Sequence, residues 1–593
     1  MTTATKTRER SAASQNEAQT EQQKKKSPKK QPNTGNGPAK DALRIIPLGG
    51  QEEVGRNMTL FEYKDDIVIL DIGLQFPEEN MPGIDYIIPD VRYLQGKEKN
   101  IRGVVLSHGH LDHIGAITHI LPKLGWPVVY GSRLTLAMVR KRLEESKLQD
   151  QFRSQEIKSA KQKLRLGKIM VKFFDVTHSI MDAVGVIIET PHGSAIHMGD
   201  WRYDLDPADG RPTNFSDLAK VGSPNHPTLL MMESLGSTKP GHQMSTKQVY
   251  DNLQRIVKGV PGRLIIATFS SMVERVGQIV NIAEKYGKKV ALDGYSMKTN
   301  MEIAKQIGYI KFHSKTLINI NQIHDYPEKK VVVICTGAQG EDRGVLMRIA
   351  TKEHRHISVL PNDTIVFSSS VIPGNERTIQ SLKDKLYRLG ANVLHQEIMD
   401  VHASGHALIE DIKLLLKEVK PTYLMPVYAN HYLLQEAKKV AMSVGFPEKN
   451  IFVLDNGNIL EWEKNTIKIL PEKIPINYVY VDGLGVGDIS HVVLRDRKMM
   501  AGDGMIVVIA TVDTKKGQLI HNPDLISRGF IYMKENKKLI EQTRRKVKRI
   551  FGGKLDTNLD ENYYKDKIRN EIGQFLYNKT QRRPMVLPVI IKV

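Results

Sequence analysis

The sequence predicts an α/β fold, in which strands and helices alternate along most of the chain. Short β-type runs bounded by glycine begin near Leu43, at 44–48 and 67–71, and an amphipathic helical pattern follows at 246–258. Four later strand-like runs each end in a loop that carries Gly or Ser, and helical stretches separate them. This alternation predicts a doubly wound parallel sheet. The four runs are 264–267, 289–292, 331–334 and 364–367.

Length and composition are those of a soluble protein with several domains. The 593 residues exceed what one hydrophobic core accommodates, and the usual domain size gives roughly three or four domains or sub-domains. No apolar run approaches the roughly 20 residues that span a bilayer. The N-terminus also lacks the apolar segment of a secretory signal. We therefore expect a cytoplasmic protein with no membrane partner.

The formal charge of +20 predicts a polyanionic partner, and nucleic acid is favoured over a role in solubility alone. Residues 1–40 contain nine Lys or Arg against three Glu and almost no large apolar residue, so we expect a disordered basic tail. The tail carries +6 of the +20, so the rest of the chain is itself basic. A strongly basic helical pattern lies at 544–549.

The single cysteine, Cys335, lies in an apolar strand-like run, which excludes a disulfide or a thiolate metal cluster within the chain. Any metal must therefore be held by histidine and carboxylate. The clearest candidate is the run His108-Gly109-His110-Leu111-Asp112-His113, which follows the strand-like segment 104–107.

In an extended chain alternate side chains share a face, so His108 and His110 can approach one ion together. Asp112 and His113 then turn toward a second ion. These ligands suit Zn²⁺ or Mn²⁺. A lone His-x-His motif is weak evidence because histidines are also common in cores and on surfaces, but the full pattern after an apolar strand favours a metal centre.

Two further candidate ligands, His178 and Asp200, also follow strand-like runs. An ordinary polar residue at a strand end is the alternative for each, but their order after the first motif favours ligands. A carboxylate at Asp200 can bridge two ions roughly 3.5 to 4 Å apart. The sequence therefore predicts a hydrolytic centre that holds two divalent ions.

These residues, in this order, resemble the metallo-β-lactamase pattern, and the continuation resembles the β-CASP nucleases and, within them, ribonuclease J. The resemblance covers nearly everything from Leu43 to Val593. The segments that carry it are 48–57, 82–90, 267–271, 336–341, 367–370, 373–376, 402–406, 481–488 and 582–588.

The resemblance implies a metallo-β-lactamase αββα sandwich with an inserted β-CASP parallel-sheet domain and a small α+β C-terminal domain. It also implies an active site in the cleft between the two main domains, self-association as a dimer or tetramer, and partners from RNA degradation or the ribosome. The expected boundaries are 1–40 for the basic tail, 41–236 and 396–465 for the two metallo-β-lactamase segments, 237–395 for the β-CASP domain, 466–480 for a linker and 481–593 for the C-terminal domain.

The implied activity is metal-dependent cleavage of single-stranded RNA in maturation and decay. It includes a 5′→3′ exonuclease that acts on 5′-monophosphorylated ends and an endonuclease. Glu233 matches the acidic β-CASP motif and His406 the histidine motif, so that with Asp200 they form the implied catalytic set. A carboxylate beside an imidazole keeps it protonated, as a general acid must be. A surface salt bridge is the alternative for Glu233.

A substrate-phosphate pocket is also implied. Ser404 and the backbone N–H of Gly405 would bind phosphate oxygens there, with Ser271 on the opposite wall. Apart from the resemblance, Ser-Gly predicts merely a turn. The pocket segment is His402, Ala403, Ser404, Gly405 and His406.

One motif departs from the family pattern. Ribonuclease J usually has Pro-Val-His-Gly-Glu, whose histidine completes the second metal site, but this chain has Pro-Val-Tyr428-Ala-Asn-His431. A phenol with a pKa near 10 is a poor neutral ligand, so we expect the second ion to bind more weakly unless His431 reaches it. The alternative is that His431 begins the helix 432–440 and contacts no metal, and both remain open.

Some family members also hold an accessory Ca²⁺ at positions that match Gly83, Asp85 and Asp482. Oxygen ligands suit that ion. Stabilisation of a turn is the alternative role for each aspartate.

Two rival functions remain. A hydrolase of small esters, thioesters or lactams would keep the metal chemistry, but the basic charge and the β-CASP motifs disfavour it. An RNA-binding scaffold with catalysis weakened at Tyr428 is disfavoured by the six metal ligands and by the pair Glu233 and His406.

Overall fold

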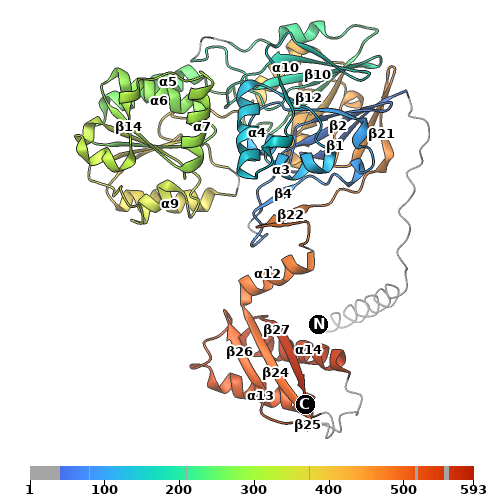
Figure 1. Ribbon diagram of the computed structural model, residues 1–593, viewed down its shortest axis with the longest axis vertical. Coiled ribbons are helices and arrows are strands. Elements are labelled where there is room, and N and C mark those ends of the chain that lie inside the picture. Colours follow the sequence, from blue (N-terminus) through green and yellow to red (C-terminus); the bar gives the residue numbers. More distant parts are fainter. Residues whose placement is uncertain are drawn as a thin grey trace, which may run out of the picture. The chain divides into compact units, whose positions relative to one another are not determined.

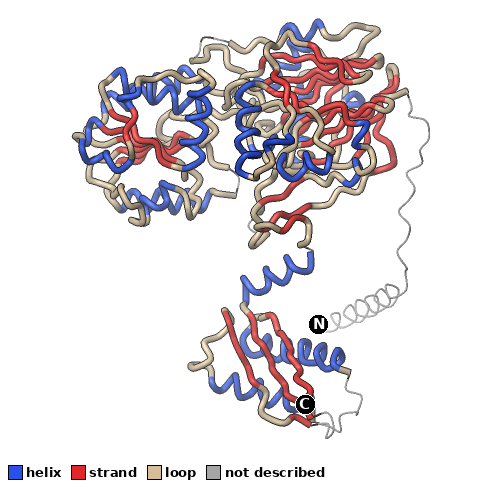
Figure 2. Tube along the Cα trace, in the orientation of Figure 1, coloured by secondary structure: helices blue, strands red, loops and turns tan. Residues whose placement is uncertain are grey.

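The computed structural model describes residues 41–593 except 79, 209, 211, 373, 490, 514–517 and 553–559. The predicted basic tail, residues 1–40, therefore lies outside the described residues. The described chain is a mixed α/β protein built on several sheets (Figure 1, Figure 2). None of its described helices is long and apolar enough to cross a membrane.

Two sheets pack face to face in the first part of the chain. The larger has eight strands in the order β21-β20-β1-β2-β3-β5-β6-β7, and the smaller has six in the order β19-β12-β11-β10-β9-β8. Their strands are β1 (Leu43–Gly49), β2 (Met58–Tyr63), β3 (Asp66–Leu70), β5 (Ile101–Val105), β6 (Val129–Gly131), β7 (Ser154–Glu156), β20 (Asn458–Glu463), β21 (Thr466–Lys473), β8 (Lys163–Leu166), β9 (Ile169–Asp175), β10 (Val184–Thr190), β11 (Gly193–His197), β12 (Thr228–Glu233) and β19 (Tyr423–Val427).

A shared core of Val, Ile, Leu and aromatic side chains fills the space between the two sheets. Because helices bury the outer face of each sheet, most of these strands are buried on both faces and form nearly continuous apolar runs. The outer helices are α3 (Ile117–Ile120) and α4 (Arg133–Glu145) on the larger sheet, and α10 (Ile409–Val419) and α11 (His431–Ser443) on the smaller. This order of layers confirms the predicted αββα sandwich.

An all-parallel sheet is inserted between β12 and α10, in the order β15-β14-β16-β13-β17-β18. Four of its strands are the predicted runs: β13 (Leu264–Thr268), β14 (Lys289–Asp293), β16 (Val331–Cys335) and β17 (Thr364–Ser368). The short edge strands are β15 (Leu317–Ile318) and β18 (Asn392–Leu394), and the helices are α5 (Thr246–Gly259), α6 (Val273–Lys285), α7 (Tyr295–Gln306), α8 (Val345–Ala350) and α9 (Glu376–Arg388). The predicted doubly wound sheet is thus confirmed, and its core lies on both faces.

The C-terminal part is a small α+β unit. Strand β24 (Met505–Asp513) pairs with β25 (Gln518–Leu519), β26 (Asp524–Arg528) and, in parallel, β27 (Met585–Lys592). Two helices, α13 (Lys537–Ile550) and α14 (Glu561–Thr580), contribute to one core with this sheet. Helix α12 (His491–Asp503) precedes them.

The segment 466–480 differs from the expected linker. Strand β21 pairs antiparallel with β20 along residues 466–473. Next, β22 (Val479–Asp482) pairs with β4 (Tyr86–Ile88) and with β23 (Gly485–Val486). Most residues of β21 are exposed, as suits a strand at the edge of a sheet. Much of the expected linker is therefore sheet, and the other domain boundaries stay predictions.

Candidate metal centre

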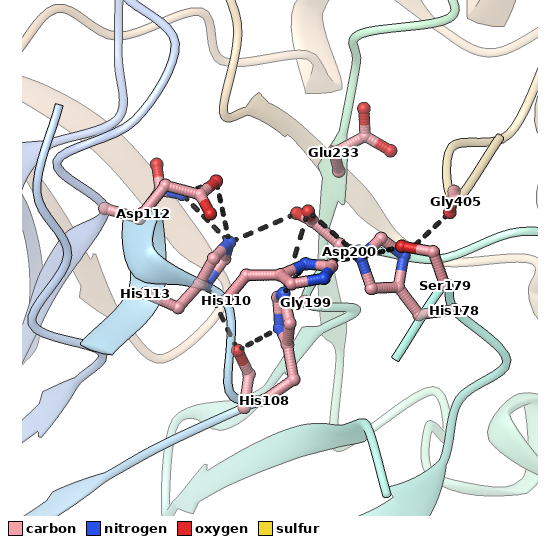
Figure 3. Close-up of polar contacts among 12 residues, drawn as sticks. His108, His110, Asp112, His113, His178, Ser179, Gly199, Asp200, Glu233 and Gly405 are labelled. Carbon is pink, nitrogen blue, oxygen red and sulfur yellow. Dashed lines mark hydrogen bonds and ion pairs between the residues drawn. The ribbon is translucent and has the colours of Figure 1, made fainter. Parts of the chain in front are cut away.

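The run that carries the first four predicted ligands leaves the carboxyl end of β5 and enters the short helix α2 (Leu111–Ile114). Strand β5 is anchored between β3 and β6, so the loop begins at a fixed point of the larger sheet. His108 and His113 are fully buried, whereas His110 and Asp112 are partly exposed. Figure 3 shows these side chains converging with those of His178 and Asp200.

The first group of candidate ligands consists of three imidazoles and one carboxylate. The Nδ1 atom of His110 lies 3.1 Å from Nε2 of His108 and 3.1 Å from Nε2 of His178. The Oδ2 atom of Asp200 lies 3.6 Å from Nε2 of His178 and 3.8 Å from Nε2 of His108. One ligand atom from each residue lies within 4.8 Å of every other, which is the convergence that a single cation requires.

The second group shares Asp200 with the first. Nε2 of His113 lies 3.4 Å from Oδ2 of Asp112 and 3.4 Å from Oδ1 of Asp200. The two oxygens of Asp200 thus face different groups, Oδ2 the first and Oδ1 the second. A carboxylate in this position can bridge two ions. The geometry brings all six predicted ligands together.

Buried acceptors orient two of the rings. The Oδ2 atom of Asp71 lies 2.8 Å from Nδ1 of His113 and also accepts from the hydroxyl of Ser107. Nδ1 of His178 donates to the carbonyl of Gly405 at 2.8 Å. A carbonyl oxygen can only accept, so the proton of His178 sits on Nδ1 and its Nε2 lone pair points at the other ligands. Such hydrogen bonds fix the tautomer that a metal needs.

The charge states also suit a cation. Burial, helped by neighbouring histidines, holds the pKa values of His108 and His178 well below their usual range, so both rings are neutral. Burial would raise the pKa of Asp200, but His113 and His178 outweigh it and keep the carboxylate ionised. His113 differs: burial opposes its charge, yet Asp112, Asp200 and Asp71 raise its pKa well above the usual value. The carboxylates therefore attract positive charge to this position, and a divalent ion held by the second group would displace the proton from Nε2 of His113.

Tyr428 follows β19 in the left-handed region, with φ of 60°. Its ring stands edge-on to His113, with centroids 5.3 Å apart, and lies 5.0 Å from the ring of His197. Its hydroxyl is buried near the carboxylate of Asp71. Burial, reinforced by Asp71 and Asp200, raises the pKa of Tyr428 well above its ordinary value. The side chain is therefore a neutral phenol that packs beside the second group, which holds three protein ligands.

His431 does not join the second group. It is the first residue of α11 and is more than half exposed, and its Nδ1 lies 3.8 Å from Oδ1 of Asp455. With Asp455 and Glu52 it forms a separate cluster. The idea that His431 replaces the missing ligand is wrong for this geometry, because the helix start directs its side chain toward Asp455.

At the expected accessory cation position the structure places the side chain of Arg497. The guanidinium of Arg497 hydrogen-bonds to the carbonyl of Gly83 at 3.2 Å and pairs with Oδ2 of Asp482 at 2.5 Å. Asp85 accepts instead from the backbone N–H of Gly483 at 2.8 Å. Arg497 therefore supplies positive charge at the position that the sequence assigned to an accessory Ca²⁺.

Glu233 and His406 lie beside the first group. Glu233, at the end of β12, is buried, and its Oε1 lies 3.5 Å from Nδ1 of His406. The same Nδ1 lies 3.9 Å from Oδ2 of Asp200. Burial opposes the charge on His406, but the carboxylates of Glu233 and Asp200 outweigh it and raise the pKa of His406 to about 9. This imidazolium can donate a proton toward the candidate metal centre.

The predicted phosphate-pocket residues lie on two loops. Residues 402–406 form a loop that precedes α10. In this loop His402 and Ala403 are buried, and Ser404 and His406 are partly exposed. Ser271 follows the carboxyl end of β13 and is also partly exposed. The rings of Phe269 and His402, 6.4 Å apart, connect the two loops.

The residues that sequence reasoning missed are Asp71, Ser107 and Arg497. Asp71 closes the apolar run 67–71, so a buried acid at that strand end was the available signal. No comparable signal marks Ser107 or Arg497, because their roles depend on residues distant in the sequence.

Among α/β proteins, a two-sheet sandwich with histidine and aspartate ligands at its strand ends defines the metallo-β-lactamase hydrolases, and the inserted parallel sheet defines their β-CASP branch. Comparison with family models agrees: the metallo-beta-lactamase superfamily model matches residues 52–263. The models described as "Ribonuclease J, beta-CASP domain" and "Ribonuclease J C-terminal domain" match 261–386 and 492–593.

Curated relatives match almost end to end. Ribonuclease J2 of Bacillus subtilis is 35% identical over 93% of this chain and 99% of its own length. Ribonuclease J 1 of Streptococcus pyogenes is 36% identical over 92% and 97%, and Ribonuclease J of Thermus thermophilus is 36% identical over 94% and 96%. The chain therefore belongs to the ribonuclease J family, which consists of metal-dependent ribonucleases.

Gly405 gives a direct test of the ligand geometry. A Cβ atom at this position would lie 2.4 Å from Cε1 of His178, whereas one at Gly259, the last residue of α5, would meet nothing within 4 Å. We expect Gly405→Ala to displace His178 and to lower retained metal and hydrolytic activity at least about tenfold, the usual size of such effects on oriented ligands. Gly259→Ala should change neither. Metal analysis after dialysis decides, and unchanged metal content in Gly405→Ala would contradict the assignment of His178.

Proposed function

We propose that this chain cleaves single-stranded RNA by metal-dependent phosphodiester hydrolysis, as a 5′→3′ exonuclease on 5′-monophosphorylated ends and as an endonuclease. The observation that carries the proposal is the position of His406 between Glu233 and Asp200, at 3.5 and 3.9 Å. A proton donor thus stands directly beside a ligand cluster. The membership of the ribonuclease J family supports RNA as the substrate.

The six histidine and aspartate ligands would hold two divalent ions, Zn²⁺ or Mn²⁺. Such ions, when bound, neutralise charge on the scissile phosphate and lower the pKa of water toward 7. The protein's own residues orient the substrate and supply a proton to the departing oxygen. His406 carries the proton for the departing 3′-oxygen, and buried Glu233 keeps that proton on the ring until bond cleavage. The product then carries a 5′-phosphate.

The loop 402–406 supports the exonuclease polarity. Ser404 is accessible, and its Oγ accepts from the backbone N–H of His406 at 3.3 Å, which ties the loop to the proton donor. A 5′-phosphate held by this loop would stand a fixed distance from the scissile bond. One nucleotide would then leave per step.

Tyr428 favours a second candidate, an RNA-binding protein with weakened catalysis. Because a phenol replaces the expected histidine, the second group has three protein ligands, Asp112, His113 and Asp200. The first group is complete without Tyr428, so we keep hydrolysis as the main proposal.

The substrate test uses 5′-labelled RNA that bears either a monophosphate or a triphosphate, with Mn²⁺ or Zn²⁺. We expect labelled mononucleotide only from the monophosphate form, because the pocket accepts one phosphate group. His110→Ala removes one of the four ligands of the first group and should abolish release, whereas the exposed His313→Ala should leave it unchanged. Absence of RNA cleavage with either metal would refute the proposal.

The second metal group can be tested at Tyr428. We expect the wild-type chain to retain about one tightly bound ion after dialysis and Tyr428→His to retain about two, because a borderline metal prefers imidazole to a neutral phenol. Tyr428→Phe keeps the ring and removes only the hydroxyl, so its metal content should equal that of the wild type. Mass spectrometry of bound metal gives the count. Two retained ions in the wild type would mean that the phenol is no obstacle.

Glu233 should set the alkaline limit of the reaction. A raised pKa means that His406 is protonated, and active as an acid, below that pKa and loses the proton as pH rises through it. Glu233→Gln removes the main carboxylate that raises the pKa, so the alkaline limb of the kcat profile should move to lower pH. Glu189→Gln, on β10 and paired with Lys172, should leave the profile in place. An unshifted limb in Glu233→Gln would exclude this role.

A further inference from the structure

The basic charge is concentrated in the C-terminal part of the chain. Residues 492–593 contain 22 Lys or Arg against 11 Asp or Glu, a net charge of +11 out of +20 for the whole protein. About a sixth of the chain thus carries more than half of the excess positive charge. The hydrolytic site lies elsewhere in the sequence, so the proposed chemistry leaves this charge unexplained.

Helix α13 presents part of this charge to solvent on one face. Its apolar side, Ile540, Val547 and Ile550, is buried in the core of the C-terminal unit. The opposite face exposes Lys537, Lys538, Lys548 and Arg549, and none of these four has an ion-pair partner in the part of the chain that the structure describes.

The other cations of α13 have ion-pair partners within the fold. Arg544 and Arg545 share Glu541, at 3.6 and 3.9 Å, and Lys546 pairs with Glu571 of α14 at 2.7 Å. Lys537, Lys538, Lys548 and Arg549 therefore differ from the other cations of α13 in having no ion-pair partner among the described residues, and we call these four the α13 cation face.

Exposed tyrosine rings flank the two ends of α13. Tyr532, 59% exposed, precedes the helix. At the other end Phe551 stacks on Tyr564, with ring centroids 5.1 Å apart and planes 7° apart. Tyr563 stands edge-on to Tyr564, with ring centroids 5.3 Å apart. Tyr563 is 54% exposed and its ring lies under Nζ of Lys567 at 5.6 Å. The aromatic stack holds the Tyr563 ring in place beside the helix end that carries Lys548 and Arg549.

Cations without protein partners, interleaved with fixed and exposed aromatic rings, have the chemistry that binds single-stranded nucleic acid. Phosphates contact the cations, and unpaired bases stack on the rings. A charged face that served solubility alone would need no ordered, exposed tyrosine. A favourable helix dipole accounts for Lys548 and Arg549 at the C-terminus of α13 but disfavours Lys537 and Lys538 at its N-terminus.

We propose that the α13 cation face, together with Tyr563, is a docking site for single-stranded RNA outside the hydrolytic centre. The proposal rests on RNA being the substrate, and it extends that function: long RNA would be held at two places, and short RNA at the active site alone. The site then acts on the affinity for long substrates and not on bond cleavage.

The test compares two variants of the full chain that lose four charges each. In one, Lys537, Lys538, Lys548 and Arg549 become Gln. In the matched control, Lys258, Lys285, Lys329 and Lys352 become Gln. These four lysines of the inserted domain are exposed. Lys258 and Lys285 lie in the last turns of α5 and α6, Lys329 lies in the turn before β16, and Lys352 follows α8, so all four precede strands and lie away from the strand ends that carry Ser271.

Binding of a 5′-monophosphorylated oligouridylate of about 30 nucleotides is measured at several salt concentrations with a chelator present, so that no cleavage occurs. Each phosphate contact contributes roughly 0.7 to the slope of log K against log salt for single strands, so the α13 variant should lose about 3 from the slope and bind at least about tenfold more weakly than the control. Its kcat/KM on an oligomer of about four nucleotides, measured with Mn²⁺, should equal that of the control.

Tyr563 provides an independent measurement. Tyr563→Ala should weaken binding of the long RNA about 5- to 100-fold, the range for loss of one base stack, and Tyr563→Phe should not, because it keeps the ring. Equal affinities and slopes for the two charge variants would overturn the proposal. Parallel losses on the long and the short RNA would also overturn it, since they would place the effect in the hydrolytic site. If the wild type fails to cleave the short RNA, the proposed function fails, while the binding comparison still decides the docking site.

Discussion

The shared carboxylate of Asp200 is the constraint on which the candidate site depends. Its two oxygens face two separate groups of ligands, at 3.6 Å from His178 and at 3.4 Å from His113. Burying a carboxylate anion costs free energy unless positively charged or hydrogen-bonding groups surround it. The loops that carry the histidines must therefore stay in register with the loop after β11. The two-sheet sandwich provides this register because each ligand follows a strand end of a fixed sheet.

The insertion of the parallel sheet is coupled to this centre through backbone contacts. The chain leaves the smaller sheet at Glu233 and returns along the loop 402–406, so the proton donor and its carboxylate stand at the two ends of the insertion. The carbonyl of Gly405 also fixes the ring of His178. Movement of the inserted domain would consequently alter a candidate metal ligand and the proton donor together. This coupling explains why a glycine is needed at 405, where the backbone approaches the ring too closely for a side chain.

Local patterns in the sequence were sufficient to predict the α/β class, the parallel sheet and the six candidate ligands, whereas the αββα layers were predicted only through the resemblance to a known family. Apolar runs that end in polar residues mark strand ends, and His108 to His113 are adjacent in the chain. Contacts between distant segments were not accessible in this way. Arg497 lies at the expected accessory cation position because α12 contacts the turn at Gly83. The start of α11 directs the side chain of His431 toward Asp455. Strand β21 was missed because an edge strand has a weaker apolar pattern than a buried one.

Tyr428 makes the two halves of the ligand cluster unequal. The left-handed backbone at this residue and the close approach of Gly50 to its ring leave the phenol little freedom to turn toward the second group. The first group, with four ligands, is unaffected. His406 lies nearest to Oδ2 of Asp200, the oxygen that faces this complete group, and not to Oδ1. His406 and the four-ligand group therefore occupy the same half of the centre, and Tyr428 lies beside the other half.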